Sequence, residues 1–343
     1  MTRYSGRSIL IRVRGQLAAV SAILALDGVA RRLLLCPPDV PEEQIPRLMQ
    51  LGEVDIMLAE ADFEVGPQAV ERSSVDLSRY DTEWVLFTSG TSGFPKLVQH
   101  SLASLIAPLD DGLPAKNAVW GTFYDIRRYG GLQILLRALI GGGSMVLSEA
   151  TEPVAAFLSR LDEAWTTHIS GTPSHWRRVL MSGAAEKITP AYVRLSGEMA
   201  GQDILDRLHA AYPQAAIGHA YASTEAGVAF SVNDGQEGFP ATVLCAGAPR
   251  PEIKVKSQTL WVRSSAAATR YLGHASRQLA DEEGFVDTGD VVEQCGDRYM
   301  FAGRREGVVN VGGMKVHPEE VEATINRHPA VAMSRVWGRP SPI

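Results

Sequence analysis

The chain has 343 residues, of which 45% are apolar and 21% are charged, and its formal net charge is −6. This length and composition predict a globular protein with a large core that divides into more than one folding unit. The acidic balance gives no basic surface for nucleic acid, and no apolar run is long enough for a membrane span.

Apolar residues in the first 225 positions alternate between helical and strand-like spacing. Helices are expected over 15–32, 42–51, 132–140, 153–164, 174–181 and 202–211. Strands are expected over 33–36, 55–59, 84–87, 119–123, 144–147, 167–170 and 193–195. Such alternation is typical of α/β layers with mostly buried parallel strands.

The pattern changes after Glu225, where helical periodicity fades. Short alternating runs predict strands at 253–256, 260–263, 285–287 and 291–293, in an antiparallel sheet or a barrel-like subdomain. A last unit is expected to hold a strand over 308–311, a helix after Pro318 and another strand beginning within 331–337. We therefore expect a large domain over 1–304, with α/β layers to about 225 and mainly β structure over 226–304. The start of a small α+β domain, incomplete in this chain, is expected over 305–343.

One segment carries more functional information than any other, 85–98, which reads V-L-F-T-S-G-T-S-G-F-P-K-L-V. A short strand runs into two glycines that allow tight turns, hydroxyls and backbone N–H groups that can face an anion, and a lysine that adds positive charge. The candidate phosphate-binding residues are Thr88, Ser89, Gly90, Thr91, Ser92, Gly93 and Lys96. A flexible linker is the alternative for such a composition. The adjoining strand and the Pro-Lys ending favour a polyphosphate site, although the spacing differs from that of P-loop nucleotide triphosphatases.

The segment T-S-G-T-S-G-F-P-K resembles the phosphate loop of the adenylate-forming superfamily. This superfamily includes acyl- and aryl-CoA synthetases, adenylation domains of peptide synthetases and beetle luciferases. Four further segments that resemble its motifs follow in the expected order: S-G-E-M-A at 196–200, Y-A-S-T-E at 221–225, D-T-G-D at 287–290, and the run from Gly303 to Glu322. Taken singly, S-G-E-M-A could be an ordinary strand-to-helix turn, and D-T-G-D could be a plain β-turn.

The resemblance implies a role for individual residues. Tyr221 would stack on adenine, Thr224 would contact the α-phosphate, and Glu225 would hold Mg²⁺, which prefers carboxylate and phosphate oxygens. Asp290 would accept the ribose hydroxyls, and Arg304 would contact ribose or phosphate. The implied nucleoside-binding residues are Gly197, Glu198, Met199, Tyr221, Asp290 and Arg304. The implied catalytic residues are Lys96, Thr224 and Glu225, with Glu225 as the metal ligand.

The C-terminal segment resembles the hinge and the beginning of the family's small domain. Arg305 and Glu306 would form the hinge, and Gly312 and Gly313 would lie along the tunnel for the CoA pantetheine. The family's small domain normally continues to a lysine in a G-K context, which this sequence does not reach. We therefore expect a trimmed or partial chain that binds ATP or AMP but forms the adenylate poorly.

The acid pocket of the family lies near the segment that here covers 122–132. Relatives carry an aromatic-histidine pair, whereas this chain has Asp125, Arg127 and Arg128. The candidate acid-pocket residues are Phe123, Tyr124, Arg127 and Arg128. Either an arginine pairs with a second polar group of the acid, or these charges pair with each other or face solvent.

The resemblance implies ATP-dependent activation of a small carboxylic acid as an acyl-adenylate, with Mg²⁺ as cofactor and CoA as the thiol co-substrate. The alternatives are an enzyme that loads a carrier protein and a degenerate relative that binds nucleotide without turnover. Cys36, Cys245 and Cys295 are well separated and lack metal-ligand spacing, and no secretion signal is recognised at the start. We therefore expect reduced thiols in a cytoplasmic protein.

Overall fold

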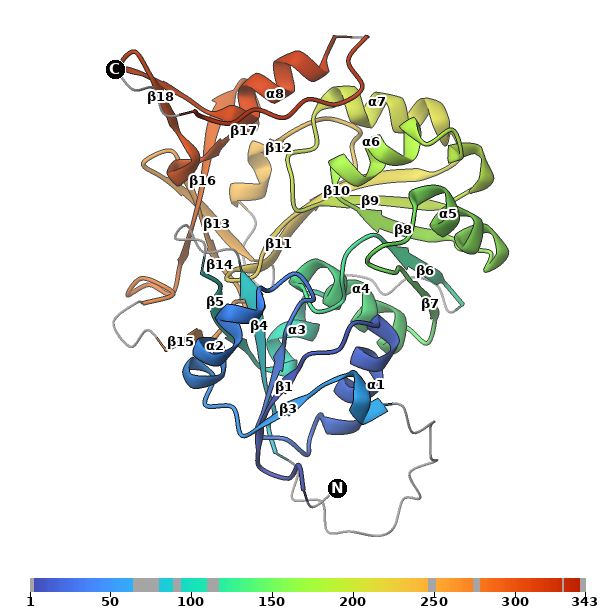
Figure 1. Cartoon of the computed structure of the whole chain (residues 1–343). Coiled ribbons are helices and arrows are strands. Elements are labelled where there is room, and N and C mark those ends of the chain that lie inside the picture. The colour runs from blue at the N-terminus through green and yellow to red at the C-terminus, as the bar shows by residue number, and fades with distance from the viewer. Residues whose placement is uncertain are drawn as a thin grey trace.

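The computed structural model describes residues 3–63, 80–88, 94–109, 117–245, 251–273, 278–328 and 330–339. Within these residues the strands form two six-stranded sheets, one five-stranded sheet and one two-stranded hairpin (Figure 1). None of the described helices is both long and apolar enough to cross a membrane.

The first sheet has the strand order β15-β5-β4-β2-β1-β3. Its strands are β1 (Ser8–Ile11), β2 (Arg32–Leu35), β3 (Ile56–Leu58), β4 (Glu83–Thr88), β5 (Lys96–His100) and β15 (Arg270–Leu272). The four strands β3, β1, β2 and β4 run parallel, whereas β5 and β15 are antiparallel to their neighbours. The helix α2 (Ile45–Leu51) packs on one face of this sheet, where a cluster of aliphatic side chains covers β2 and β4.

The second sheet has the order β11-β10-β9-β8-β6-β7. Its strands are β6 (Val119–Thr122), β7 (Ser144–Leu147), β8 (His168–Gly171), β9 (Tyr192–Ser196), β10 (Ala216–Ser223) and β11 (Gly227–Val232). They are parallel except for β11. The helices α5 (Val154–Glu163), α6 (Pro173–Met181) and α7 (Gln202–Ala211) cover one face. Between the two sheets lie α1 (Gln16–Leu26), α3 (Leu102–Ile106) and α4 (Tyr129–Ile140), whose apolar side chains share one core.

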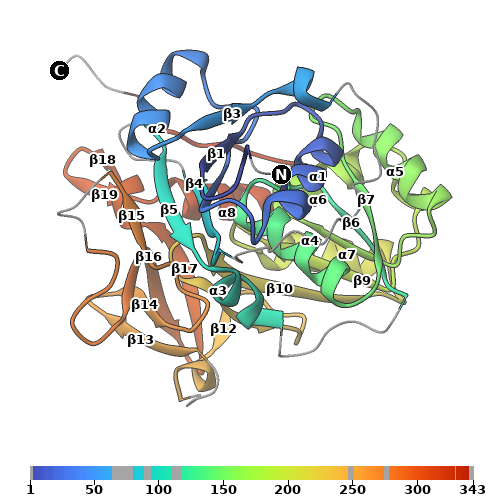
Figure 2. The same cartoon turned by 90° about the horizontal axis from the view of Figure 1, so that it is seen from below.

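The third sheet is antiparallel and follows the order β12-β17-β16-β14-β13. Its strands are β12 (Phe239–Pro240), β13 (Glu252–Lys256), β14 (Thr259–Arg263), β16 (Val286–Cys295) and β17 (Arg298–Arg304). In both views it lies beside the first two sheets (Figure 1, Figure 2). A hairpin of β18 (Val309–Val311) and β19 (Met314–Val316) then leads into α8 (Pro318–Asn326), which packs against β17.

The α/β fold expected from the sequence is confirmed, with layers of the expected kind and an antiparallel sheet after Glu225. Eight strands were not expected from the sequence: β1, β5, β10, β11, β12, β15, β17 and β19. The two strands expected over 285–287 and 291–293 form the single strand β16. The first helix was expected to continue beyond Leu26, where Gly28 adopts a φ of 79°. The boundary at 304 between a large and a small domain stays a prediction.

The strand expected within 331–337 is wrong, because the described residues 331–339 contain no strand. Their polar groups bond to helices instead of a neighbouring strand. The carbonyl of Val331 accepts from Arg207 of α7, and the amide of Val336 donates to Glu322 of α8. These bonds to side chains replace the ladder that a strand would need.

Candidate active site

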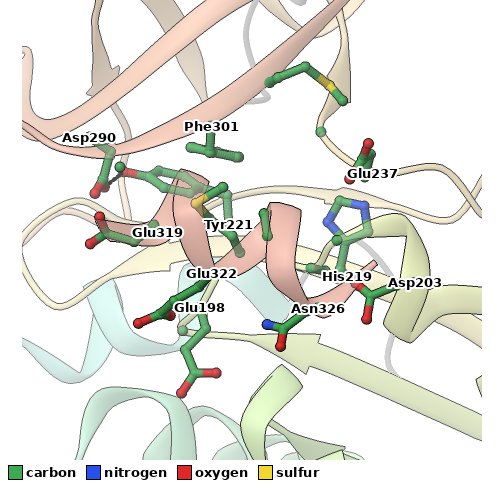
Figure 3. Close-up of a pocket in the computed structure, with 18 of the residues that line it drawn as sticks. Glu198, Asp203, His219, Tyr221, Glu237, Asp290, Phe301, Glu319, Glu322 and Asn326 are labelled. Carbon is green, nitrogen blue, oxygen red and sulfur yellow. Dashed lines mark hydrogen bonds between the residues drawn. The ribbon is translucent and has the colours of Figure 1, made fainter. Parts of the chain in front are cut away.

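A cavity of about 300 Å³ lies beyond the carboxyl ends of β9 and β10. Ligands of α/β sheets usually bind at this edge, where loops rather than strands form the wall. The cavity brings together all six residues that the sequence assigned to nucleoside binding: Gly197, Glu198, Met199, Tyr221, Asp290 and Arg304. They come from three separate parts of the chain, namely the loop after β9, the strand β10 and the strands β16 and β17 (Figure 3).

Tyr221 and Asp290 form one wall of this cavity. The buried hydroxyl of Tyr221 donates to Oδ2 of Asp290 (Figure 3). Nε of Arg304 lies 3.1 Å from Oδ1 of the same carboxylate. Burial raises the pKa of Tyr221 well above its ordinary value, with the charge of Asp290 as a further cause. Burial also raises the pKa of Asp290, although Arg304 opposes this shift. The ring of Tyr221 lies nearly parallel to Phe230 and Phe301, at centroid distances of 5.4 and 5.2 Å.

The loop after β9 is held by contacts that fix its path. Gly197 has a φ of 83°, a left-handed conformation that glycine adopts without strain. Oε2 of Glu198 accepts from the amide of Ser174 at the start of α6, at 2.9 Å. The hydroxyl of Tyr124 donates to the carbonyl of Ser196 at 2.6 Å. Tyr124, assigned to the acid pocket from the sequence, therefore supports the nucleoside loop.

Thr224 and Glu225 lie in the turn between β10 and β11, directly after the part of β10 that lines the cavity. Oε1 of Glu225 accepts from the hydroxyl of Tyr271 at 3.2 Å, and the Glu225 carbonyl accepts from the amide of Ala268 at 2.9 Å. No group of three metal-binding side chains occurs among the described residues. A single carboxylate fits Mg²⁺ that keeps several waters and is held largely by substrate phosphates.

The phosphate-loop residues are only partly within the described chain. Thr88 ends β4 and Lys96 begins β5, and the two are paired in the antiparallel register of these strands. The buried Oγ1 of Thr88 has no hydrogen-bond partner among the described residues, so it is available to a ligand oxygen. Five residues of the loop lie outside the described residues: Ser89, Gly90, Thr91, Ser92 and Gly93.

The interpretation of Arg127 as a ligand for the acid needs correction. Its side chain is fully buried, and Nε and Nη2 bind the two carboxylate oxygens of Asp125 at 2.7 and 2.5 Å. Its remaining donors reach the carbonyls of Val13 and Arg14. Arg127 therefore ties the loop before α4 to the segment after β1, as the alternative of mutual pairing expected.

Arg128 and Phe123 line a second cavity, of about 310 Å³. Arg128 is partly exposed and bonds to Asp39 at 2.7 Å. His175, which was not expected as a site residue, also lines this cavity, and its ring stacks on Phe123 with centroids 5.5 Å apart. His175 also completes a capping box with Thr172 at the start of α6. The sequence T-P-S-H was the available signal, although it indicates a helix start rather than a site.

The hinge and tunnel residues lie between the third sheet and α8. Arg305 and Glu306 belong to a short 3₁₀ turn, in which Arg305 bonds to Asp287 at 2.8 Å. Gly312 and Gly313 form the tip of the β18–β19 hairpin, with φ values of 58° and 89° and open space where a Cβ would stand. A set of cavity residues from α8 was also missed, Glu319, Glu322, Ala323 and Asn326 (Figure 3).

Comparison with known proteins agrees with this arrangement. The 2-succinylbenzoate–CoA ligase of Salmonella typhimurium is 25% identical, over 96% of this chain and 73% of the relative. The 4-chlorobenzoate–CoA ligase of an Arthrobacter species is 30% identical, over 76% of this chain and 54% of that protein. A probable non-canonical nonribosomal peptide synthetase of Salinispora arenicola is also similar, at 27% identity over 92% of this chain and 4% of that protein.

Among solved structures, the o-succinylbenzoate coenzyme A synthetase of Bacillus subtilis in complex with AMP has the same fold, with a TM-score of 0.77. It is 18% identical in sequence, and the match covers 99% of this chain and 77% of that one. The model of the AMP-binding enzyme family matches residues 11–259. These residues are most of the sequence, and the chain belongs to the AMP-binding enzyme family.

Proposed function

We propose that this chain binds ATP and activates a small carboxylic acid as an acyl-adenylate, which a thiol then converts into a thioester. The observation that carries the proposal is the meeting of the six nucleoside-binding candidates in one cavity, with Thr224 and Glu225 at the end of the same strand. Two of the similar proteins are named as CoA ligases, which supports CoA as the acceptor of the acyl group.

The chemistry of the first cavity suits a nucleoside. Six carboxylate residues line it, namely Glu198, Asp203, Glu237, Asp290, Glu319 and Glu322. Several of them already face arginines, because Arg177 pairs with Asp203 and Arg327 with Glu237. The acceptors that remain fit ribose hydroxyls and an adenine amino group, which are hydrogen-bond donors. Phosphates would instead extend towards Thr88 and Lys96.

In the proposed reaction a carboxylate oxygen of the acid forms a bond to the α-phosphorus while the bond to the pyrophosphate oxygen breaks. Catalysis of this kind depends on positioning and charge stabilisation. Asp290 and Arg304 would fix the ribose, Thr224 would donate to the α-phosphate, and Lys96 would neutralise charge on the leaving pyrophosphate. Mg²⁺, held by Glu225 and the phosphates, would supply further charge neutralisation.

The second cavity is the candidate site for the acid, with Phe123 and Arg128 in its wall. Tyr124 lies between the residues of the two cavities, because its hydroxyl binds Ser196, which precedes Gly197 of the first cavity, and its ring meets His175 of the second edge to face at 5.9 Å. The Gly312–Gly313 tip is the candidate contact for a pantetheine chain, whether this belongs to CoA or to a carrier protein.

We also propose that the protein works in the cytoplasm. Cys245 and Cys295 are exposed free thiols and Cys36 is a buried one, as suits a reducing compartment.

A screen of the full chain with ATP, Mg²⁺, hydroxylamine and a panel of aromatic and aliphatic acids tests the proposed activity, because an acyl-adenylate yields a hydroxamate. Calorimetric titration with AMP tests the nucleotide site. Asp290→Ala should weaken AMP binding about tenfold or more, whereas Asp297→Ala, an exposed residue in the turn between β16 and β17, should leave it unchanged. Glu225→Gln should weaken binding of Mg-ATP.

Three outcomes would contradict different parts of the proposal. Equal AMP affinity in wild type and Asp290→Ala would show that the ribose assignment is wrong. Tight AMP binding without hydroxamate from any acid would favour the nucleotide-binding relative without turnover. Transfer of the acyl group to carrier protein but not to CoA would favour the carrier-loading alternative.

A further inference from the structure

His100 lies where the strand that leaves the phosphate loop meets the second sheet. It is the last residue of β5, and its side chain is fully buried. Nε2 lies 2.7 Å from the carbonyl oxygen of Thr224, and Nδ1 lies 3.1 Å from Oγ of Ser104. The bond to Thr224 therefore crosses from the first sheet to the turn that carries Glu225.

The hydrogen-bond partners determine which nitrogen carries the proton. Burial lowers the pKa of His100 to about 4, so the imidazole is neutral at physiological pH. A neutral imidazole has one N–H donor, and a carbonyl oxygen only accepts. The proton therefore lies on Nε2 and is donated to Thr224, while Nδ1 is left to accept from Ser104.

Two other contacts link the same turn to the neighbourhood of β5. Tyr271 of β15 donates to the Glu225 carboxylate at 3.2 Å, and β15 pairs with β5 over Leu97, Val98 and Gln99. The amide of Ala268 donates to the Glu225 carbonyl at 2.9 Å. Three hydrogen bonds therefore connect the Thr224–Glu225 turn to β5, to β15 and to the segment before β15. Two of them bind Glu225, and the bond from His100 binds Thr224.

We propose that His100 is a positioning residue that sets Thr224 and Glu225 at a fixed distance from Thr88 and Lys96. The inference rests on the proposed function, because it assumes that the loop and the turn contact the phosphates of one nucleotide. Thr88 and Lys96 lie at one end of the β4–β5 pair, and His100 lies at the opposite end of β5. The strand β5 therefore connects Lys96 at one end with the hydrogen bond to Thr224 at the other. Preorganised groups of this kind avoid reorganisation when charge develops.

Two substitutions of His100 separate this bond from packing. In His100→Gln the side-chain amide reaches the position of Nε2 and keeps a donor for Thr224. In His100→Asn the shorter amide reaches only the position of Nδ1, so the bond to Thr224 is lost and the contact with Ser104 is kept. Ser104→Ala is the control, because it removes the contact at Nδ1 and the side-chain bonds to Ser101 but keeps the bond from His100 to Thr224.

The measurements are calorimetric dissociation constants of the full chain for Mg-ATP and for adenosine, together with melting temperatures. His100→Asn should weaken Mg-ATP binding about tenfold, as expected for loss of one buried hydrogen bond, with adenosine binding unchanged. His100→Gln and Ser104→Ala should both stay close to wild type for Mg-ATP. Adenosine serves as the reference because it uses the Tyr221 and Asp290 wall and has no phosphates.

Equal Mg-ATP affinity in His100→Asn and His100→Gln, at any level, would overturn the positioning role. Parallel weakening of Mg-ATP and adenosine in line with the melting temperature would overturn it as well, because it would reveal a purely structural effect. If the wild type binds adenosine and Mg-ATP but the two His100 variants bind Mg-ATP equally, the positioning role fails and the proposed function stands. A wild type that binds neither ligand defeats both proposals.

Discussion

The hydroxyl of Tyr221 donates a hydrogen bond to Asp290, and this bond joins the second sheet to the third in the wall of the first cavity (Figure 3). Tyr221 belongs to β10 and Asp290 to β16, and the strands β12, β13 and β14 of the third sheet lie between them in the sequence. The Asp290 carboxylate is held between a phenol and the Arg304 guanidinium. The geometry of the nucleoside site therefore depends on the docking of two sheets.

Removal of the Tyr221 hydroxyl tests how much this bond contributes to the free energy of unfolding. Tyr221→Phe keeps the ring between Phe230 and Phe301 and deletes a hydrogen bond to a buried carboxylate. The free energy of unfolding should fall by about 1.5–3 kcal/mol, the range for bonds to charged groups. Tyr299→Phe is the control, because its hydroxyl makes an exposed bond to Gln294 at 3.3 Å. Equal losses in urea unfolding would contradict a special role for the buried bond.

The pH dependence of stability follows from the raised pKa of Asp290, which burial causes and Arg304 opposes. Between the ordinary pKa of 3.8 and the raised value the folded state binds more protons than the unfolded state. This carboxyl group therefore lowers the stability as the pH rises through that window. Asp290→Asn removes this loss, so the stability of the variant relative to wild type should increase as the pH rises above 3.8.

Asp234→Asn gives the opposite sign and serves as the comparison. Burial acts to raise the pKa of Asp234, but hydrogen bonds from Arg298 and the Gln236 amide lower it overall. Wild type then gains stability as the pH rises through the window below 3.8, and the asparagine variant loses relative stability there. Urea unfolding of both variants over the same pH series checks the two signs together. Identical slopes would show that neither shift governs the stability.

The motifs of the nucleoside site could be predicted because each is a short run of sequence with its own chemistry. Pairing of Arg127 with a nearby charge was one of two alternatives, but its bonds to the carbonyls of Val13 and Arg14 could not be foreseen, since these residues lie more than a hundred positions away. The strand β10 was missed because A-I-G-H-A-Y-A-S has few β-branched residues and owes its state to the strands on either side. Glu319 of α8 reaches the cavity only because Gly303 of β17 leaves room for it.

Gly227 follows the Thr224–Glu225 turn and has a φ of +78°. A Cβ at this position would lie 2.5 Å from Cβ of Ala266 and 2.6 Å from its carbonyl oxygen. Gly227→Ala should therefore push the turn away from the segment that holds the Glu225 carbonyl, and weaken Mg-ATP binding. Gly296→Ala is the control, because Gly296 has a φ of +63° and open space around it.

The left-handed conformation alone should cost about 1–2 kcal/mol in the Gly296→Ala control. The overlap with Ala266 should cost Gly227→Ala about 1–3 kcal/mol more. Urea unfolding measures both losses, and titration with Mg-ATP measures the displacement of the turn. If the two variants unfolded alike, the backbone around Ala266 would be free to move, and the close approach would not constrain the site.

Arg127 and Arg128 are neighbours in sequence with different surroundings, so a matched pair of substitutions distinguishes a structural from a substrate-binding role. Arg127→Met leaves the Asp125 carboxylate without its buried partner and should lower the free energy of unfolding by about 3–5 kcal/mol. Arg128→Met removes a partly exposed pair with Asp39 and should cost less than about 1 kcal/mol. Urea unfolding and the hydroxamate acid panel together provide the test. A stable Arg127→Met variant with an altered acid preference would return Arg127 to the acid pocket, because a residue that only ties α4 to β1 should change stability without changing the ranking of acids.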